Sequence, residues 1–134
     1  SLVGSEMCIR DRMKYIVPVY GAGLWGPIWG YIAMNADGQS IYGAYFAHQG
    51  ETPGLGAEIE KPAFSDQFKG KTLYDEGTFE PVKVVKNGHE PEKGSYVHAI
   101  SGGTITSQGV QKMLDNSMRP YDAFFRNLQN QDKK

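Results

Sequence analysis

A long uncharged stretch near the start of the chain limits what this part of the sequence can form. No charged side chain occurs in residues 15–36, and the stretch is long enough to cross a bilayer as a helix. Two prolines and four glycines interrupt it, namely Pro18, Pro27, Gly21, Gly23, Gly26 and Gly30. Because glycine and proline disfavour helix interiors, we predict strands joined by a glycine-rich turn, and no membrane-spanning helix in this stretch.

The neighbouring segments continue the strand pattern. Residues 14–20 are rich in β-branched and aromatic side chains, which favours a strand. The apolar runs 31–34 and 41–46 flank residues 35–38, and an Asp-Gly pair between such runs is a strong hairpin signal. Further along, residues 81–86 and 96–100 are predicted to form short strands.

Helical periodicity occurs in three later segments. Phe64 and Phe68 recur at helical spacing within residues 62–69. A helix beginning near Thr104 would carry one face made of Ile105, Gly109, Val110, Met113, Leu114 and Ser117. Pro120 starts a second helix, with Tyr121, Phe124, Phe125 and Leu128 on one face. This order of elements predicts an α+β fold, a mostly antiparallel sheet with flanking and C-terminal helices.

The first twelve residues do not fit the pattern. Segment 1–12 resembles translated adapter or vector sequence, so we interpret it as non-native and exclude it from the fold prediction. The natural protein would then begin further upstream. The segment holds the only cysteine, Cys8, so the rest has no disulfide or thiolate chemistry. We predict one domain over residues 13–128 and a frayed tail over 129–134.

Residues 21–26 match the pattern G-x-G-x-x-G after a predicted strand. A dinucleotide-binding site would need a helix directly afterwards and an acid about 20 positions on. Pro27 and a strand-like run follow instead, and the nearest acid, Asp37, lies in the hairpin turn. We therefore expect the glycines to bend the backbone and place Trp25 and Trp29 near a ligand or the core. The formal net charge of −1 also argues against nucleic-acid binding.

Residues 48–56, HQGETPGLG, form a longer connection than a turn requires. Their glycines allow close backbone approach, while three side chains offer polar contacts: His48, Glu51 and Thr52. Both a ligand-binding loop and an ordinary polar loop agree with this pattern. Metal binding is disfavoured, because His89 and His98 belong to other segments and no ligand spacing recurs.

Residues 101–110, SGGTITSQGV, combine glycines and hydroxyls in front of a predicted helix. The helix start would offer free backbone N–H groups, and Gly102 and Gly103 leave room for a phosphate. The helix dipole adds only about 0.3–1 kcal/mol, up to about 2 kcal/mol when partly buried, so it would orient a phosphate without retaining it, whereas an esterified hydroxyl at the same place could retain it. A plain N-cap role for Ser101 or Thr104, worth about 1 kcal/mol, is equally compatible. A hydrolase is disfavoured because no G-x-S-x-G occurs.

Taken together, GLWGPIWG, HQGETPGLG and SGGTITSQGV resemble the FMN-binding domain found in the C subunit of the Na⁺-translocating NADH:quinone reductases. The resemblance runs from about residue 14 to residue 128. In this family the threonine of Ser-Gly-Ala-Thr carries FMN through a phosphoester that a flavin transferase forms. The resemblance implies that Thr104 has this role. It further implies cofactor-binding roles for Ser101, Gly102, Gly103, Thr106, Trp25, His48, Glu51, Thr52 and Leu55.

The resemblance also implies the setting. The domain would be an electron carrier without catalytic side chains or a metal, and NADH and sodium would be handled by other subunits. A single N-terminal helix, absent from this sequence, would anchor it to the bacterial inner membrane with the flavin domain on the periplasmic face. Two residues depart from the family pattern. Gly103 replaces the usual alanine, and His98 stands where the transferase recognition pattern has aspartate, so flavin attachment could be slow or absent.

Three alternatives follow from the same residues. The G subunit of the Rnf complex shares the flavin threonine, but the Gly-Leu-Trp of residues 23–25 favours the C subunit of the sodium-translocating enzyme. A binding module could hold a flavin or another phosphate ligand noncovalently. A soluble nicotinamide dehydrogenase is disfavoured by the context of the glycine motif.

Overall fold

The computed structural model describes residues 5–9 and 12–132, and its largest element is a four-stranded antiparallel sheet in the order β1-β2-β3-β4. Its strands are β1 (Ser5–Ile9), β2 (Arg12–Ala22), β3 (Pro27–Asn35) and β4 (Ile41–His48). The uncharged stretch forms most of β2 and β3, which confirms the predicted strands and glycine-rich turn. Within the described residues, no helix has the length and apolar character needed to cross a membrane.

The predicted hairpin joins β3 to β4. The amide of Gly38 donates to the carbonyl of Asn35 at 3.1 Å, and Gly38 has the left-handed φ of +71° that glycine adopts without strain. The carboxylate of Asp37 accepts the amides of Gln39 and Ser40, which closes the turn. The turn sequence therefore sets the register of β3 and β4.

The remaining elements are shorter, except for two helices near the C-terminus. They are η1 (Gly56–Glu60), α1 (Pro62–Ser65), η2 (Asp66–Phe68), β5 (Tyr74–Asp75), β6 (Thr78–Phe79), β7 (Lys83–Val85), β8 (Tyr96–His98), α2 (Thr104–Met118), η3 (Arg119–Tyr121) and α3 (Asp122–Asp132). β5 and β6 pair antiparallel, while β7 and β8 form a parallel pair. The α+β fold with a mostly antiparallel sheet is thus confirmed.

The first and last elements extend beyond the predicted domain of residues 13–128. Residues 5–9, which the sequence interpretation set aside as non-native, form β1 and pair with β2. The native or non-native origin of segment 1–12 stays a prediction. At the other end, α3 runs to Asp132, so the helix continues into the segment for which a frayed tail was predicted.

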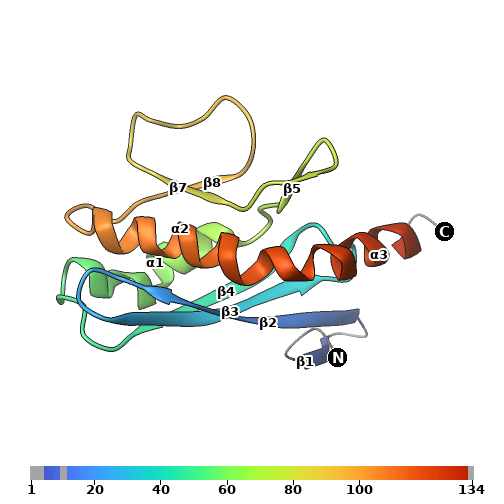
Figure 1. Ribbon diagram of the computed structural model, residues 1–134, viewed down its shortest axis with the longest axis horizontal. Coiled ribbons are helices and arrows are strands. Elements are labelled where there is room, and N and C mark those ends of the chain that lie inside the picture. Colours follow the sequence, from blue (N-terminus) through green and yellow to red (C-terminus); the bar gives the residue numbers. More distant parts are fainter. Residues whose placement is uncertain (1–4, 10–11, 133–134) are drawn as a thin grey trace.

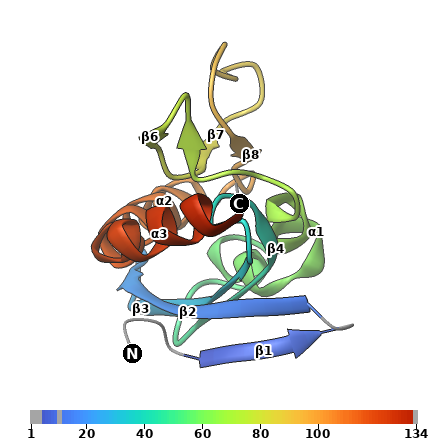
Figure 2. The same ribbon diagram turned by 90° about the vertical axis from the view of Figure 1, so that its right-hand side faces the viewer.

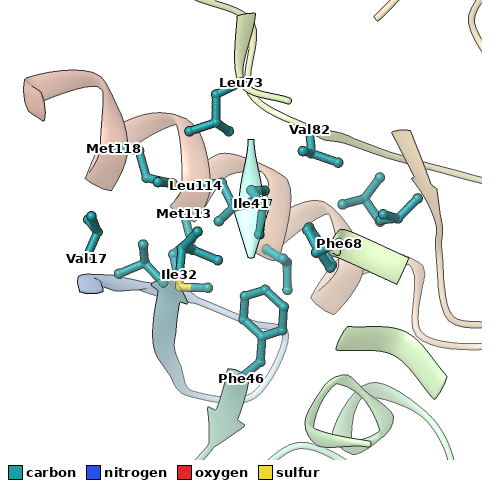
Figure 3. Packing of buried hydrophobic residues seen from close by; sticks show 14 of the residues in the cluster. Val17, Ile32, Ile41, Phe46, Phe68, Leu73, Val82, Met113, Leu114 and Met118 are labelled. Atoms are coloured by element: carbon teal, nitrogen blue, oxygen red, sulfur yellow. The ribbon is translucent and has the colours of Figure 1, made fainter. Parts of the chain in front are cut away.

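The helix α2 lies between two layers of strands (Figure 1). Its lower side packs on the main sheet, and β7 and β8 lie beyond its upper side. Figure 2 shows the same arrangement after a turn of 90°. A helix in this position must bury apolar groups on more than one side. Met113, Leu114 and Met118 are fully buried in a core that includes Val17 of β2 and Val82 (Figure 3).

Close contacts fix α2 against β2. A Cβ on Gly109 would lie 2.3 Å from the carbonyl oxygen of Ala22, so only glycine permits this approach. The hydroxyl of Ser117 accepts the amide of Tyr20 at 3.0 Å and donates to its carbonyl oxygen at 3.2 Å. On the face predicted for α2, Val110, Met113 and Leu114 are buried, whereas Ile105 is 55 % exposed.

Candidate functional site

A cavity of about 400 Å³ opens at one end of α2. Three segments form its walls: the turn between β2 and β3, the loop that follows β4, and the first turn of α2. Its lining residues are Leu24, Trp25, Glu51, Thr52, Leu55, Gly56, Gly102, Gly103, Thr104, Ile105 and Thr106. The three motifs singled out in the sequence therefore meet at one place, although they are far apart along the chain.

Most of the predicted site residues line this cavity, and two do not. Ser101 is exposed and lies outside it. His48 lies behind the wall, where its Nδ1 accepts the amide of Glu51 at 3.1 Å and its Nε2 is 3.5 Å from Glu60 Oε2. His48 therefore shapes the loop and does not line the cavity. The described residues contain no His, Cys, Asp and Glu cluster that could hold a metal ion.

The start of α2 supplies backbone donors to the cavity wall. The N-cap is Gly103, which has no side chain, so of the two interpretations of this segment the structure does not show the plain N-cap role for Ser101 or Thr104. The amides of Thr104, Ile105 and Thr106 have no acceptor among the described residues. Such a first turn favours an anionic group. Thr104 places a hydroxyl-bearing side chain in the same wall.

Nearby contacts hold this helix start in place. The hydroxyl of Ser107 accepts the amide of Ile100 at 3.1 Å, and the amide of Gly103 donates to the carbonyl of Ile100 at 2.9 Å. Gly102 has a φ of +77°, which suits glycine, and a Cβ there would lie 2.6 Å from Leu55 Cδ2. The two glycines therefore let the loop after β4 approach the helix closely.

The carboxylate of Glu51 connects all three walls. Its Oε1 accepts the amide of Leu24 at 3.0 Å, and its Oε2 accepts the amide of Trp25 at 2.9 Å. The hydroxyl of Thr106 donates to Oε1 as well. Glu51 is only 4 % exposed, and a Cβ on Gly23 would lie 2.7 Å from its Oε1. The side chain is therefore occupied by the protein and sets the shape of the cavity.

Two effects act on the pKa of this carboxyl. Burial raises the pKa of Glu51, whereas the hydrogen bonds from Thr106 and from the backbone of residues 24–26 lower it. The hydrogen bonds prevail, so the pKa lies below its ordinary value and Glu51 is ionised at neutral pH.

Three lining residues were not predicted from the sequence. Leu24 and Ile105 are exposed apolar side chains, and Gly56 is a buried glycine that leaves space for the Thr106 hydroxyl. Leu24 adjoins Trp25, and Trp25 is itself 68 % exposed. An apolar pair inside a glycine-rich turn is a signal that could have identified Leu24. The exposed apolar side chains of the cavity lining form its rim, namely Leu24, Trp25, Leu55 and Ile105.

The apolar rim and the polar helix start suit a ligand with an apolar body and a phosphate. The fold and site thus define a binding domain of the α+β class for a phosphate-bearing ligand. Residues 23–119 match the family described as FMN-binding domain, and the chain belongs to this family. The matched range contains all three walls of the cavity.

The chain is also similar in sequence to individual named proteins. The chain is 44 % identical over 102 residues to the C subunit of the Na(+)-translocating NADH-quinone reductase of Vibrio anguillarum, a match that covers 76 % of this chain and 40 % of that protein. It is 38 % identical over 131 residues to the same subunit of Chlamydia muridarum, covering 84 % and 41 %. The chain therefore spans about two fifths of the length of these relatives.

Two solved structures share the fold of this chain. The chain superposes on the C subunit of the Na(+)-translocating NADH-quinone reductase from Parabacteroides distasonis with a TM-score of 0.88 at 54 % identity, covering 90 % of this chain and 60 % of that one. NqrC of Shewanella oneidensis gives a TM-score of 0.75 at 36 % identity, covering 87 % and 55 %.

Proposed function

We propose that this chain is the flavin-carrying domain of the C subunit of a Na⁺-translocating NADH:quinone reductase, and that Thr104 bears FMN through a phosphoester. The observation that carries the proposal is the position of Thr104. It is the first residue of α2 and lines the cavity, and its own amide and those of the next two residues have no acceptor among the described residues.

The residues of the cavity fit the two parts of FMN. Trp25 and Leu55 offer apolar surface for the ring system, while the first turn of α2 offers donors for the phosphate. Bound FMN would supply the ability to accept and donate electrons. The chain would bind and orient the flavin and exclude water from it. Glu51 would act indirectly, because its carboxylate oxygens are occupied by Leu24, Trp25 and Thr106.

The partners follow from the similarity to these relatives. Other subunits of the complex would bind NADH and conduct sodium, and a flavin transferase would attach FMN to Thr104. The relatives are longer than this chain. We assign the membrane anchor to the part of the subunit outside this sequence, with the flavin domain on the periplasmic face. The Rnf-type subunit is the second candidate within the same class.

The mass of the intact chain tests covalent attachment. The full chain would be coexpressed with a flavin transferase and an export signal, and then denatured. We expect a mass gain equal to FMN less one water, lost in Thr104→Ala and retained in Thr106→Val, which removes the neighbouring hydroxyl. An adduct that forms only in His98→Asp would mean that His98 impairs recognition by the transferase. No adduct in any form would overturn covalent attachment and leave a noncovalent FMN-binding module.

A further inference from the structure

A second cavity, of about 200 Å³, lies on the other side of Thr104. It is bounded by the end of β7, by the turn of residues 86–89 and by the first two turns of α2. Thr104 is the one residue among those described that lines both this cavity and the cavity of about 400 Å³. The hydroxyl proposed to carry the flavin therefore belongs to the wall between two spaces.

The two cavities differ in charge. The larger one has a single charged lining residue, Glu51, whose carboxylate is ionised. The smaller one is lined by Lys86 and His89 and by no acidic residue. Among the described residues, neither Lys86 nor His89 takes part in an ion pair. An anion at Thr104 would thus be repelled by Glu51 on one side and attracted by Lys86 on the other.

The backbone holds the two basic residues over α2. The amide of His89 donates to the carbonyl of Lys86 at 3.0 Å, and Gly88 has a φ of +87° within this turn. Just before the turn, the carbonyl of Val85 accepts the amide of Ala99 at 2.7 Å. The amide of Val84 donates to the side chain of Gln111 at 2.8 Å, which ties β7 to α2.

We infer that Lys86 and His89 form a phosphate subsite that holds the charged oxygens of the flavin phosphate at Thr104. The first-turn amides of α2 would contact the same phosphate from the side of the larger cavity, which otherwise takes the apolar ring system. A phosphate esterified to both riboflavin and threonine keeps one negative charge, which Lys86 would neutralise. This inference rests on the proposed function, because it assigns the two halves of the same ligand to the two cavities.

Riboflavin and FMN differ only in the phosphate group, so the difference between their affinities measures what the phosphate contributes to binding. The full chain, produced without a transferase, would be titrated with each by calorimetry. We expect wild type to bind FMN at least about tenfold more tightly than riboflavin, as charge-assisted hydrogen bonds imply. Lys86→Gln should remove most of this preference without changing riboflavin binding, and Lys86→Arg should retain it.

Lys93→Gln is the matched control, because Lys93 is an exposed lysine of the same loop that lines neither cavity. It should leave the preference intact, and His89→Gln should reduce it partly. The inference is overturned if wild type binds both ligands equally, if Lys86→Gln keeps the preference, or if neither ligand binds. The adduct on Thr104 is measured separately. An adduct without a phosphate preference would reject the subsite alone, whereas a preference without an adduct would reject covalent attachment alone.

Discussion

The hydroxyl of Thr106 donates a hydrogen bond to the buried carboxylate of Glu51, a residue 55 positions earlier in the chain. The same carboxylate accepts the backbone amides of Leu24 and Trp25. One side chain thereby holds together the glycine turn, the loop after β4 and the first turn of α2. The cavity depends on an acid that is itself almost inaccessible to a ligand.

Replacing this acid should destabilise the fold. In Glu51→Gln the side-chain NH₂ group would face a backbone or hydroxyl donor, so at least one buried donor would lose its acceptor. We expect the free energy of unfolding to fall by about 2–4 kcal/mol, measured by urea denaturation. Thr106→Val should cost only about 1 kcal/mol. Glu60→Gln, at an exposed acid, should cost little. Equal losses for Glu51 and Glu60 would contradict the role assigned to Glu51.

The lowered pKa of Glu51 predicts a dependence of stability on pH. Folding favours the ionised carboxyl, so its contribution is fully present above its ordinary pKa of 4.5 and is lost as the pH falls through the folded value. We expect the difference in free energy of unfolding between wild type and Glu51→Gln to shrink below pH 4.5. Taking this difference removes the contribution of Asp122, whose pKa is also lowered. A difference that is constant from pH 7 to pH 3 would refute the prediction.

Gly109 should not tolerate the substitution that usually stabilises a helix. Glycine to alanine within a helix gains about 1 kcal/mol from propensity. Here the new Cβ would lie 2.3 Å from the carbonyl oxygen of Ala22. We therefore expect Gly109→Ala to lower the free energy of unfolding by about 1–3 kcal/mol. Gly26→Ala, at a position with no atom within 4 Å of the added Cβ, is the control and should be nearly neutral.

Trp25 should become less accessible when a flavin binds. It lines the cavity and is 68 % exposed, whereas Trp29 is half-buried and lies outside the cavity. Variants that keep one tryptophan, Trp29→Phe and Trp25→Phe, report on each ring separately. We expect FMN to reduce acrylamide quenching in Trp29→Phe and to leave Trp25→Phe unchanged. If FMN leaves the quenching of Trp25 in Trp29→Phe unchanged, the ring system does not lie against Trp25.

His98 should limit the rate of flavin attachment. Its Nε2 lies 3.1 Å from Glu90 Oε1, so an aspartate at this position would face a second carboxylate. We expect His98→Asp to be flavinylated faster than wild type, and His98→Asp combined with Glu90→Gln to be faster still. The fraction of adduct against time, followed by intact mass, gives the rates. Equal rates for wild type and His98→Asp would show that the transferase does not read this side chain.

Local patterns were sufficient for much of the fold. The Asp37-Gly38 turn and the periodicity of α2 depend on neighbouring residues, and both were predicted from the sequence. The three cavity walls were also found, because glycines and hydroxyls are concentrated there for close approach and polar contact.

Contacts between distant residues were not predictable in this way. The exposure of Ile105 depends on how α2 is rotated between two layers, and the parallel pairing of β7 and β8 depends on a connection of irregular structure. The helix start near Thr104 was predicted, but the turn closed by Ile100 and Gly103, which makes Gly103 the N-cap in place of Ser101 or Thr104, was not. The contact that joins Glu51 to Thr106 was not predicted, because nothing near Glu51 in the sequence reveals this partner.

The packing of α2 on β2 also affects the rate of folding and the order in which the elements come together. Tyr20 and Ser117 are hydrogen-bonded across 97 positions, so this contact closes a very long loop. Folds dominated by such contacts form slowly. During synthesis, strands β2–β4 leave the ribosome well before α2, and the part of their apolar face that α2 covers stays exposed until the helix arrives. The cavity at Thr104 forms only after α2 has docked, because α2 supplies one of its walls, so the attachment proposed here is confined to chains in which this packing has formed.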